Sequence, residues 1–219
     1  MQKVLKPCNN FSARKIILDD GTTQDIDIKN KIADFNDYDE DNKKYVTNTY
    51  KTKEDMNKEL FDFIKILPAD VLLNLNSNIS KIYVSEGIQS CYSKKNKSLY
   101  TGFDLPVIAH EIGHSIDFRD KIADSKELID IYKDEINSFN TCFPEPVQEL
   151  IKYFGPMGSG YSGTGLNELI AETNMLLTTH GPNYDKVKIR SEYLVRYFPK
   201  TVAKIAELLG YNTKCPVSE

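Results

Sequence analysis

The sequence predicts an α+β fold in which a small mixed β-sheet with an N-terminal helical region precedes a mostly helical half. Alternating β-forming residues over 81–85 and 98–101 predict neighbouring strands. Apolar residues at helical spacing start near residue 53 and dominate after Gly102. A chain of 219 residues can bury one sizeable core. We therefore expect a single domain over 1–219, with an N-terminal helical and charged portion (1–80) and a second portion (81–219) that carries the chemistry.

The N-terminal portion has a weak pattern. Residues 13–19 read as a short strand, and residues 20–50, rich in Asp, Asn and Lys, as a loop or a short exposed helix. From Lys53 apolar residues recur every four positions until Pro68, which predicts a helix. A second short helix is expected over 69–75.

The second portion begins with strands and continues with helices. A strand over 81–85 is followed by a hairpin, in which 90–92 and 98–101 flank the basic turn Lys94-Lys95-Asn96-Lys97. Asp104 can cap the next helix, with Pro106 in its first turn. Later helices are expected over 124–138 (starting at a capping box of Asp124 and Glu127), 145–154, 167–179, 186–197 and 200–209, with Gly155, Gly181 and Gly210 at C-caps.

Charge and hydropathy exclude two classes of protein. The 28 basic residues against 32 acidic ones give a net charge of -4, so we expect no nucleic-acid partner. No apolar run approaches the roughly 20 residues that span a bilayer, which excludes a transmembrane segment. The N-terminus is basic but lacks the apolar core of a secretion signal. The protein is therefore either cytosolic or secreted with its signal removed; we expect the second, and a monomer.

Four cysteines are spread along the chain: Cys8, Cys91, Cys142 and Cys215. No Cys-x-x-Cys pair is present, which argues against a cysteine zinc site. Two disulfides or buried free thiols are both compatible with this spacing, and Cys8 and Cys215 could join the two ends of the chain.

A His-Glu-x-x-His motif marks the candidate chemistry. On a helix, His110 and His114 share one face, so both imidazoles can bind one zinc ion. Glu111 can reach the water that the metal activates without binding the metal itself. Ile108, Ile112 and Ile116 form the opposite, apolar stripe. With three histidines in 219 residues, chance would produce roughly 0.002 such motifs, so the pattern is specific.

A catalytic zinc needs a third protein ligand and an open fourth position. The candidates are His180 and a carboxylate from a later helix. Glu168 and Glu172 are spaced i, i+4; Glu168 would bind zinc, and Glu172 could accept a hydrogen bond from a ligand histidine. Asp117 is a second candidate for that role. The alternative for both glutamates is an exposed acidic helix face.

Tyr161 lies in the glycine-rich stretch 158–165, seven residues before Glu168. Its hydroxyl could donate to the oxyanion that forms when an amide is hydrolysed, and the glycines would let it swing toward a substrate. The alternative is that Tyr161 is one of the thirteen tyrosines used in packing.

Three segments together resemble the catalytic domain of anthrax lethal factor and the related bacterial Pro-Pro endopeptidases. They are His110-Glu111-Ile112-Gly113-His114-Ser115-Ile116-Asp117, then Tyr161, then Glu168-Leu169-Ile170-Ala171-Glu172. The similarity covers roughly residues 80 to 210. It implies a zincin-like fold of the gluzincin type: one zinc ion held by His110, His114 and Glu168, with Glu111 as general base and Tyr161 as transition-state donor. The segment between His114 and Glu168 is longer than the family pattern.

The predicted function is hydrolysis of an extended peptide segment by a secreted bacterial zinc metalloprotease. The peptide is expected to pair with the strand that contains Leu99, Tyr100 and Thr101, adding a strand to the sheet edge. The alternative is a toxin-like binding domain of the same fold with little or no activity, although a structural zinc has no need of Glu111. A weaker hypothesis gives the charged 20–50 stretch a docking role.

Overall fold

The computed structural model describes residues 5–6, 13–17, 22–27, 31, 33, 37–39, 44–46, 69–84, 89–102, 105–138, 165–178 and 194–210. Two compact units divide the chain, Met1–Glu111 and Ile112–Glu219. The boundary between them falls inside one continuous helix, α3 (Leu105–Asp120). The expectation of one domain over 1–219 stays a prediction.

Short strands dominate the described N-terminal residues. Strand β2 (Ala13–Ile17), predicted over 13–19, pairs antiparallel with β1 (Leu5–Lys6) and β3 (Thr23–Asp27). Strands β4 (Asp37–Asp39) and β5 (Lys44–Val46) form a second antiparallel pair. The prediction of loop or helix over 20–50 is therefore wrong for these residues. Segments with so few apolar residues become strands because a partner strand completes their backbone hydrogen bonds, which local pattern does not reveal.

Helix α2 (Ala69–Asn78) confirms the short helix expected from residue 69 and is three residues longer. Its last turn contains no basic residue. The cation comes instead from Lys31, whose Nζ donates to the main-chain oxygens of Asn76 (2.6 Å) and Ile79 (2.7 Å). A positive charge there offsets the partial negative charge of a helix C-terminus. The helix expected over 53–68 lies outside the described residues.

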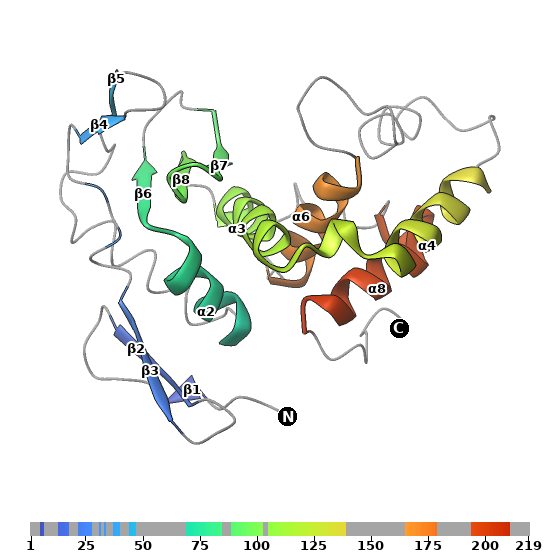
Figure 1. Ribbon diagram of the computed structural model, residues 1–219, viewed down its shortest axis with the longest axis horizontal. Coiled ribbons are helices and arrows are strands. Elements are labelled where there is room, and N and C mark those ends of the chain that lie inside the picture. Colours follow the sequence, from blue (N-terminus) through green and yellow to red (C-terminus); the bar gives the residue numbers. More distant parts are fainter. Residues whose placement is uncertain are drawn as a thin grey trace. The chain divides into compact units, whose positions relative to one another are not determined.

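The predicted mixed sheet is confirmed. Its strands are β6 (Lys81–Val84), β7 (Cys91–Ser93) and β8 (Ser98–Thr101), in the order β6-β8-β7 (Figure 1). Strand β8 runs parallel to β6 and antiparallel to β7, with which it forms the predicted hairpin. The basic turn closes with Lys97 in the left-handed region (φ 54°).

The central position of β8 overturns one prediction about the substrate. Leu99, Tyr100 and Thr101 are fully buried, and both edges of their strand already pair with β6 and β7. Tyr100 stacks on Tyr83 with ring centroids 4.9 Å apart. A peptide cannot add to a strand whose hydrogen bonds are already taken, so these three residues are core and not a substrate-binding edge.

The second half of the described chain is helical, as predicted. After α3 come a 3₁₀ turn η2 (Ile122–Asp124), α4 (Lys126–Asn137), α6 (Gly165–Thr178) and α8 (Pro199–Leu208). The N-cap of α4 is Ser125, whose side chain accepts from Leu128 N–H, so the prediction of Asp124 as the cap is wrong by one residue. Gly210 follows α8 with φ 80°, as a helix C-terminus favours.

A buried carboxylate joins α4 to α8, which lie side by side (Figure 1). Glu135 of α4 accepts from the main-chain N–H groups of Lys200 (2.8 Å) and Thr201 (2.9 Å) and from the Thr201 hydroxyl (2.6 Å). These are donors of the first turn of α8, which no residue of the helix itself can satisfy. Three residues before Glu135 on α4, Tyr132 stacks on Phe198, the residue before α8. Burial raises the pKa of the Tyr132 hydroxyl above its ordinary value.

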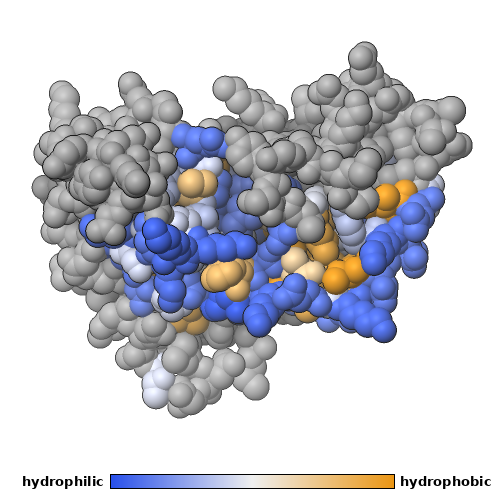
Figure 2. Space-filling view, turned by 45° about the horizontal axis from the view of Figure 1, so that its top comes forward, coloured by the Kyte–Doolittle hydropathy of each residue, from blue (hydrophilic) through white to orange (hydrophobic). Residues whose placement is uncertain are grey.

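Hydrophilic residues cover most of the described surface in Figure 2, and hydrophobic atoms are confined to small areas. Among the described residues the exposed large hydrophobic side chains are Phe118 and Leu208. None of the described helices is long and apolar enough to cross a membrane.

We predict that Glu135→Ala lowers the free energy of unfolding by about 2–3 kcal/mol. The substitution leaves two N–H groups and a hydroxyl at the start of α8 without their buried acceptor. Urea unfolding followed by circular dichroism measures the change.

Glu127→Ala is the matched control, because Glu127 lies on the same helix but is exposed and pairs with Lys204 at the surface (2.8 Å). We expect its unfolding curve to overlay that of the wild type. If the two variants unfold alike, the buried cap does not hold α8 in place.

Candidate metal site

Helix α3 has the two faces that its sequence predicts. Ile108, Ile112 and Ile116 are buried. His110 and His114 are half-buried, one helical turn apart. Because a continuous helix carries both imidazoles, their spacing follows from helix geometry alone.

The third predicted ligand, Glu168 in the first turn of α6, is in reach of the histidines. One nitrogen from each of His110 and His114 and one oxygen of Glu168 all lie within 4.8 Å of one another. His114 Nε2 and Glu168 Oε1 are 3.6 Å apart. Two ligand atoms bonded at 2.0–2.2 Å to a tetrahedral zinc lie about 3.3–3.6 Å apart. Two imidazoles and a carboxylate are donor types that zinc takes, and the separation of His114 from Glu168 matches zinc geometry, so this group could hold a metal ion.

The exposure of these side chains bears on the kind of metal site that they could form. All three side chains are half-buried, and those of His114 and Glu168 expose 23% and 21% of their area. Structural zinc sites are closed by four protein ligands, whereas catalytic sites leave one position open. Partly exposed ligands are compatible with a catalytic site, and that role stays a prediction.

Glu111 is buried on α3, with only 5% of the residue exposed, although it directly follows the half-buried His110. A buried carboxylate is costly unless hydrogen bonds or a cation compensate it. Its position next to a metal ligand is compatible with the predicted role as a base, which stays a prediction.

Glu172 follows Glu168 by one turn of α6 and is 1% exposed. This burial contradicts the alternative of an exposed acidic helix face. The Oε2 atom of Glu172 is buried as well. A carboxylate buried one turn from a ligand is suited to accept a hydrogen bond from a ligand imidazole, and this role stays a prediction.

Asp117 is buried near the end of α3 and has partners that the sequence did not indicate. Its Oδ1 accepts from the main-chain N–H of Ala123 in η2 (2.7 Å), and its Oδ2 accepts from Nδ2 of Asn167 in α6 (2.6 Å). Asn167 directly precedes Glu168. The sequence reasoning missed Asn167, because a polar residue in the first turn of a helix is unremarkable.

The approach of α3 to α6 depends on Gly113, which lies inside the His-Glu-x-x-His motif. A Cβ atom added there would lie 2.7 Å from the Cα of Ala171 and 3.0 Å from the Cβ of Asn174. A glycine inside a helix costs about 1 kcal/mol relative to alanine, so its presence between two candidate metal ligands was the available signal. Only a residue without a side chain lets the two backbones come this close.

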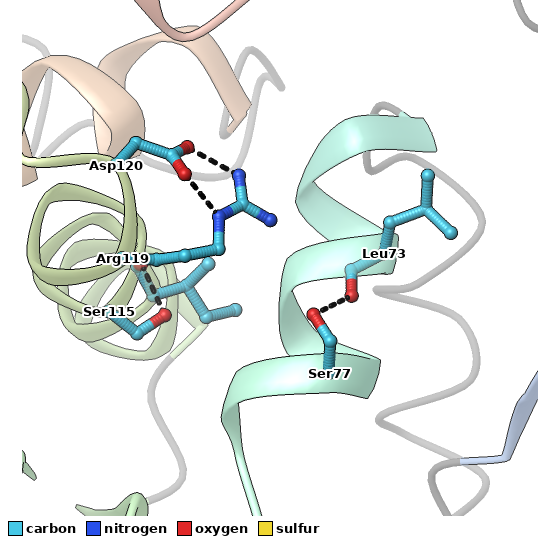
Figure 3. Close-up of polar contacts among 6 residues, drawn as sticks. Leu73, Ser77, Ser115, Arg119 and Asp120 are labelled. Atoms are coloured by element: carbon cyan, nitrogen blue, oxygen red, sulfur yellow. Dashed lines mark hydrogen bonds and ion pairs between the residues drawn. The ribbon is translucent and has the colours of Figure 1, made fainter.

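Two polar side chains after His114 have local partners (Figure 3). The Ser115 hydroxyl is buried and donates to the main-chain oxygen of Ile112 (2.8 Å), a common arrangement for serine within a helix. Arg119 pairs through two nitrogens with the carboxylate of Asp120 at the exposed end of α3. The Ser115 contact follows from helix structure and the Arg119–Asp120 contact is an exposed ion pair, and we assign neither to the metal site.

Several predicted residues lie outside the described residues. They are Tyr161, His180, Cys8, Cys142 and Cys215, with the helices expected over 145–154 and, in large part, 186–197. Cys91 is described and lies exposed on β7. The described group contains all three predicted metal ligands: His110, His114 and Glu168.

Comparisons with models of protein families, with curated proteins and with solved structures found no match to this chain.

We predict that Gly113→Ala lowers the free energy of unfolding by about 1–3 kcal/mol, because its methyl group meets backbone atoms that cannot rotate away. The melting temperature, measured by circular dichroism, should fall, although alanine has the higher helix propensity.

Gly102→Ala is the control, because a Cβ atom at Gly102 meets nothing within 4 Å. We expect its melting temperature to match that of the wild type. A Gly113→Ala protein as stable as the wild type would mean that the helices separate at no cost.

Proposed function

We propose that this chain is a secreted zinc-dependent endopeptidase that hydrolyses peptide bonds in protein substrates. The observation that carries the proposal is the group formed by His110, His114 and Glu168, together with Glu111 inside the same motif. Resemblance of these residues, with Tyr161, to the lethal factor catalytic domain and the Pro-Pro endopeptidases supports the reaction class.

Each of these residues has a separate role in the proposed hydrolysis. When bound, zinc would act as a Lewis acid that polarises the scissile carbonyl and lowers the pKa of a water molecule. The Glu111 carboxylate takes the proton of the attacking water and later delivers it to the leaving amine. Tyr161 donates a hydrogen bond to the oxyanion. His110, His114 and Glu168 keep the metal in place through these steps.

The substrate is proposed to be an extended peptide. It cannot pair with β8, which is the central strand. Strand β7 pairs with β8 on one side, and its residues Cys91–Ser93 are exposed or half-buried. If a peptide extends this sheet, it needs such an edge strand. Proline on both sides of the cut would place the activity with the Pro-Pro endopeptidases.

The second candidate is a zinc-containing binding domain without activity. It differs from the first in one respect, because only the enzyme needs Glu111 as a base. Stoichiometric zinc with no cleavage of a diverse peptide library, read by mass spectrometry against a zinc-chelated control, would favour the binding domain.

We predict that His110→Ala, His114→Ala and Glu168→Ala each lose stoichiometric zinc, because two remaining ligands hold the ion poorly. Glu111→Gln should retain zinc and lose at least about 100-fold in kcat, because an amide cannot accept the proton. Plasma emission spectrometry measures the metal, and peptide cleavage followed by mass spectrometry measures turnover.

Glu127→Gln, at an exposed position on α4, is the control and should keep both zinc and turnover. Near-normal turnover of Glu111→Gln would overturn the assignment of the base. Full zinc content in His114→Ala would overturn the metal site.

Tyr161→Phe should lower kcat by about 10²–10³ and leave the zinc content at one ion per chain, because only the oxyanion donor is removed. The same two assays test it. Loss of zinc from this variant would mean that Tyr161 supports the metal site and does not act on the substrate.

A further inference from the structure

Asp117 connects the end of α3 with η2 and α6. Its main-chain oxygen accepts from Lys121 N–H (2.7 Å) where α3 ends, and one carboxylate oxygen accepts from Ala123 N–H in η2. The other oxygen accepts from Asn167 Nδ2 in α6 at 2.6 Å. With 5% of the residue exposed, water competes little for these bonds. A buried, charge-assisted hydrogen bond of this length is among the stronger contacts between neutral and charged side chains.

The contacts of α6 with α3 fall on one face of α6. Asn167 contacts Asp117, and Ala171 and Asn174 lie against Gly113. Their spacing of i, i+4 and i+7 is that of a single helical stripe. Gly113 and Asp117 are likewise i, i+4 on α3. The two helices therefore meet at two levels, one by close backbone packing and one by the Asp117–Asn167 hydrogen bond.

The hydrogen-bonded level is the one nearest Glu168 on α6, whereas Gly113 of the packing level lies beside His114 on α3. Asn167 is the residue before Glu168, and Asp117 follows His114 by three residues. The packing level at Ala171 lies one turn further along α6. Close packing sets how near the helices come, whereas a hydrogen bond in the first turn also limits rotation of that turn. That rotation decides where the Glu168 carboxylate points.

We propose that Asn167 is a positioning residue for the metal site. Through its hydrogen bond to Asp117, it holds the first turn of α6 so that Glu168 Oε1 stays near the 3.6 Å from His114 Nε2 that one ion requires. This inference rests on the proposed function only in that the site binds zinc. Through Asn167, Asp117 then helps to place the Glu168 carboxylate. This role is separate from its predicted role as a hydrogen-bond acceptor for a ligand histidine.

The test uses a reversal of donor and acceptor. Asn167→Ala removes the donor, and Asn167→Asp places two carboxylates against each other. The double variant Asp117→Asn with Asn167→Asp restores one bond in the opposite direction. The new amide at position 117 would donate to the new carboxylate at position 167, and its oxygen would still accept from Ala123 N–H. The zinc dissociation constant of each full-length chain is measured by competition with a chromophoric chelator, at a temperature where circular dichroism shows every variant to be folded.

We expect Asn167→Ala and Asn167→Asp to bind zinc about 10–100-fold more weakly than the wild type. The double variant should recover most of that loss, because the two positions act as a pair. If Asn167→Ala does not fold, Asn167→Asp and the double variant still decide the matter. A wild-type dissociation constant in the single variants, or no recovery in the double variant, overturns the proposal.

Ser125→Ala separates positioning from general stability. It removes the N-cap contact of α4 just after η2, and we expect a lower melting temperature with an unchanged zinc dissociation constant. If Ser125→Ala weakens zinc binding as much as Asn167→Ala, the role of Asn167 is merely structural and the proposal falls. Failure of the wild-type chain to bind zinc, or wild-type affinity in His114→Ala, would instead overturn the proposed metal site.

Discussion

The close approach of α3 and α6 at Gly113 and Ala171 is the constraint on which the site depends. A Cβ atom at Gly113 would lie 2.7 Å from the backbone of Ala171, so the two helices come closer than side chains normally permit. The histidines belong to one helix and Glu168 to the other. A displacement of either helix would change the distance between the candidate ligand atoms, for which a zinc ion has narrow limits.

The core maintains this approach by leaving α6 little freedom. Most residues of α6 are buried, including Leu169, Ile170 and Met175, and the half-buried Asn167 and Glu168 lie in its first turn. A helix buried almost all round belongs to the interior. The cap that Glu135 provides for α8 contributes to the same core, because α8 contacts both α4 and α6.

Much of the helical half could be predicted because its periodic patterns are strong. The stripe of Ile108, Ile112 and Ile116 predicted the buried face of α3, and it is buried. The prediction failed where pairing decides the structure. Strand β3 has one apolar residue and becomes a strand through β2. The residues of β8 were read as an edge, but whether a strand is central depends on its neighbours and not on its own composition.

The candidate donor atoms of the site can be identified from the sequence alone: two imidazoles one turn apart, a glutamate between them, and a Glu-x-x-x-Glu pair downstream. Helix periodicity suffices for that, since i and i+4 always share a face. Packing between helices, by contrast, brings Glu168 to His114, buries Glu172, and joins Asp117 to Asn167 fifty residues away. Contacts between helices depend on which faces pack together, and a local sequence pattern does not show which helix a given face will contact.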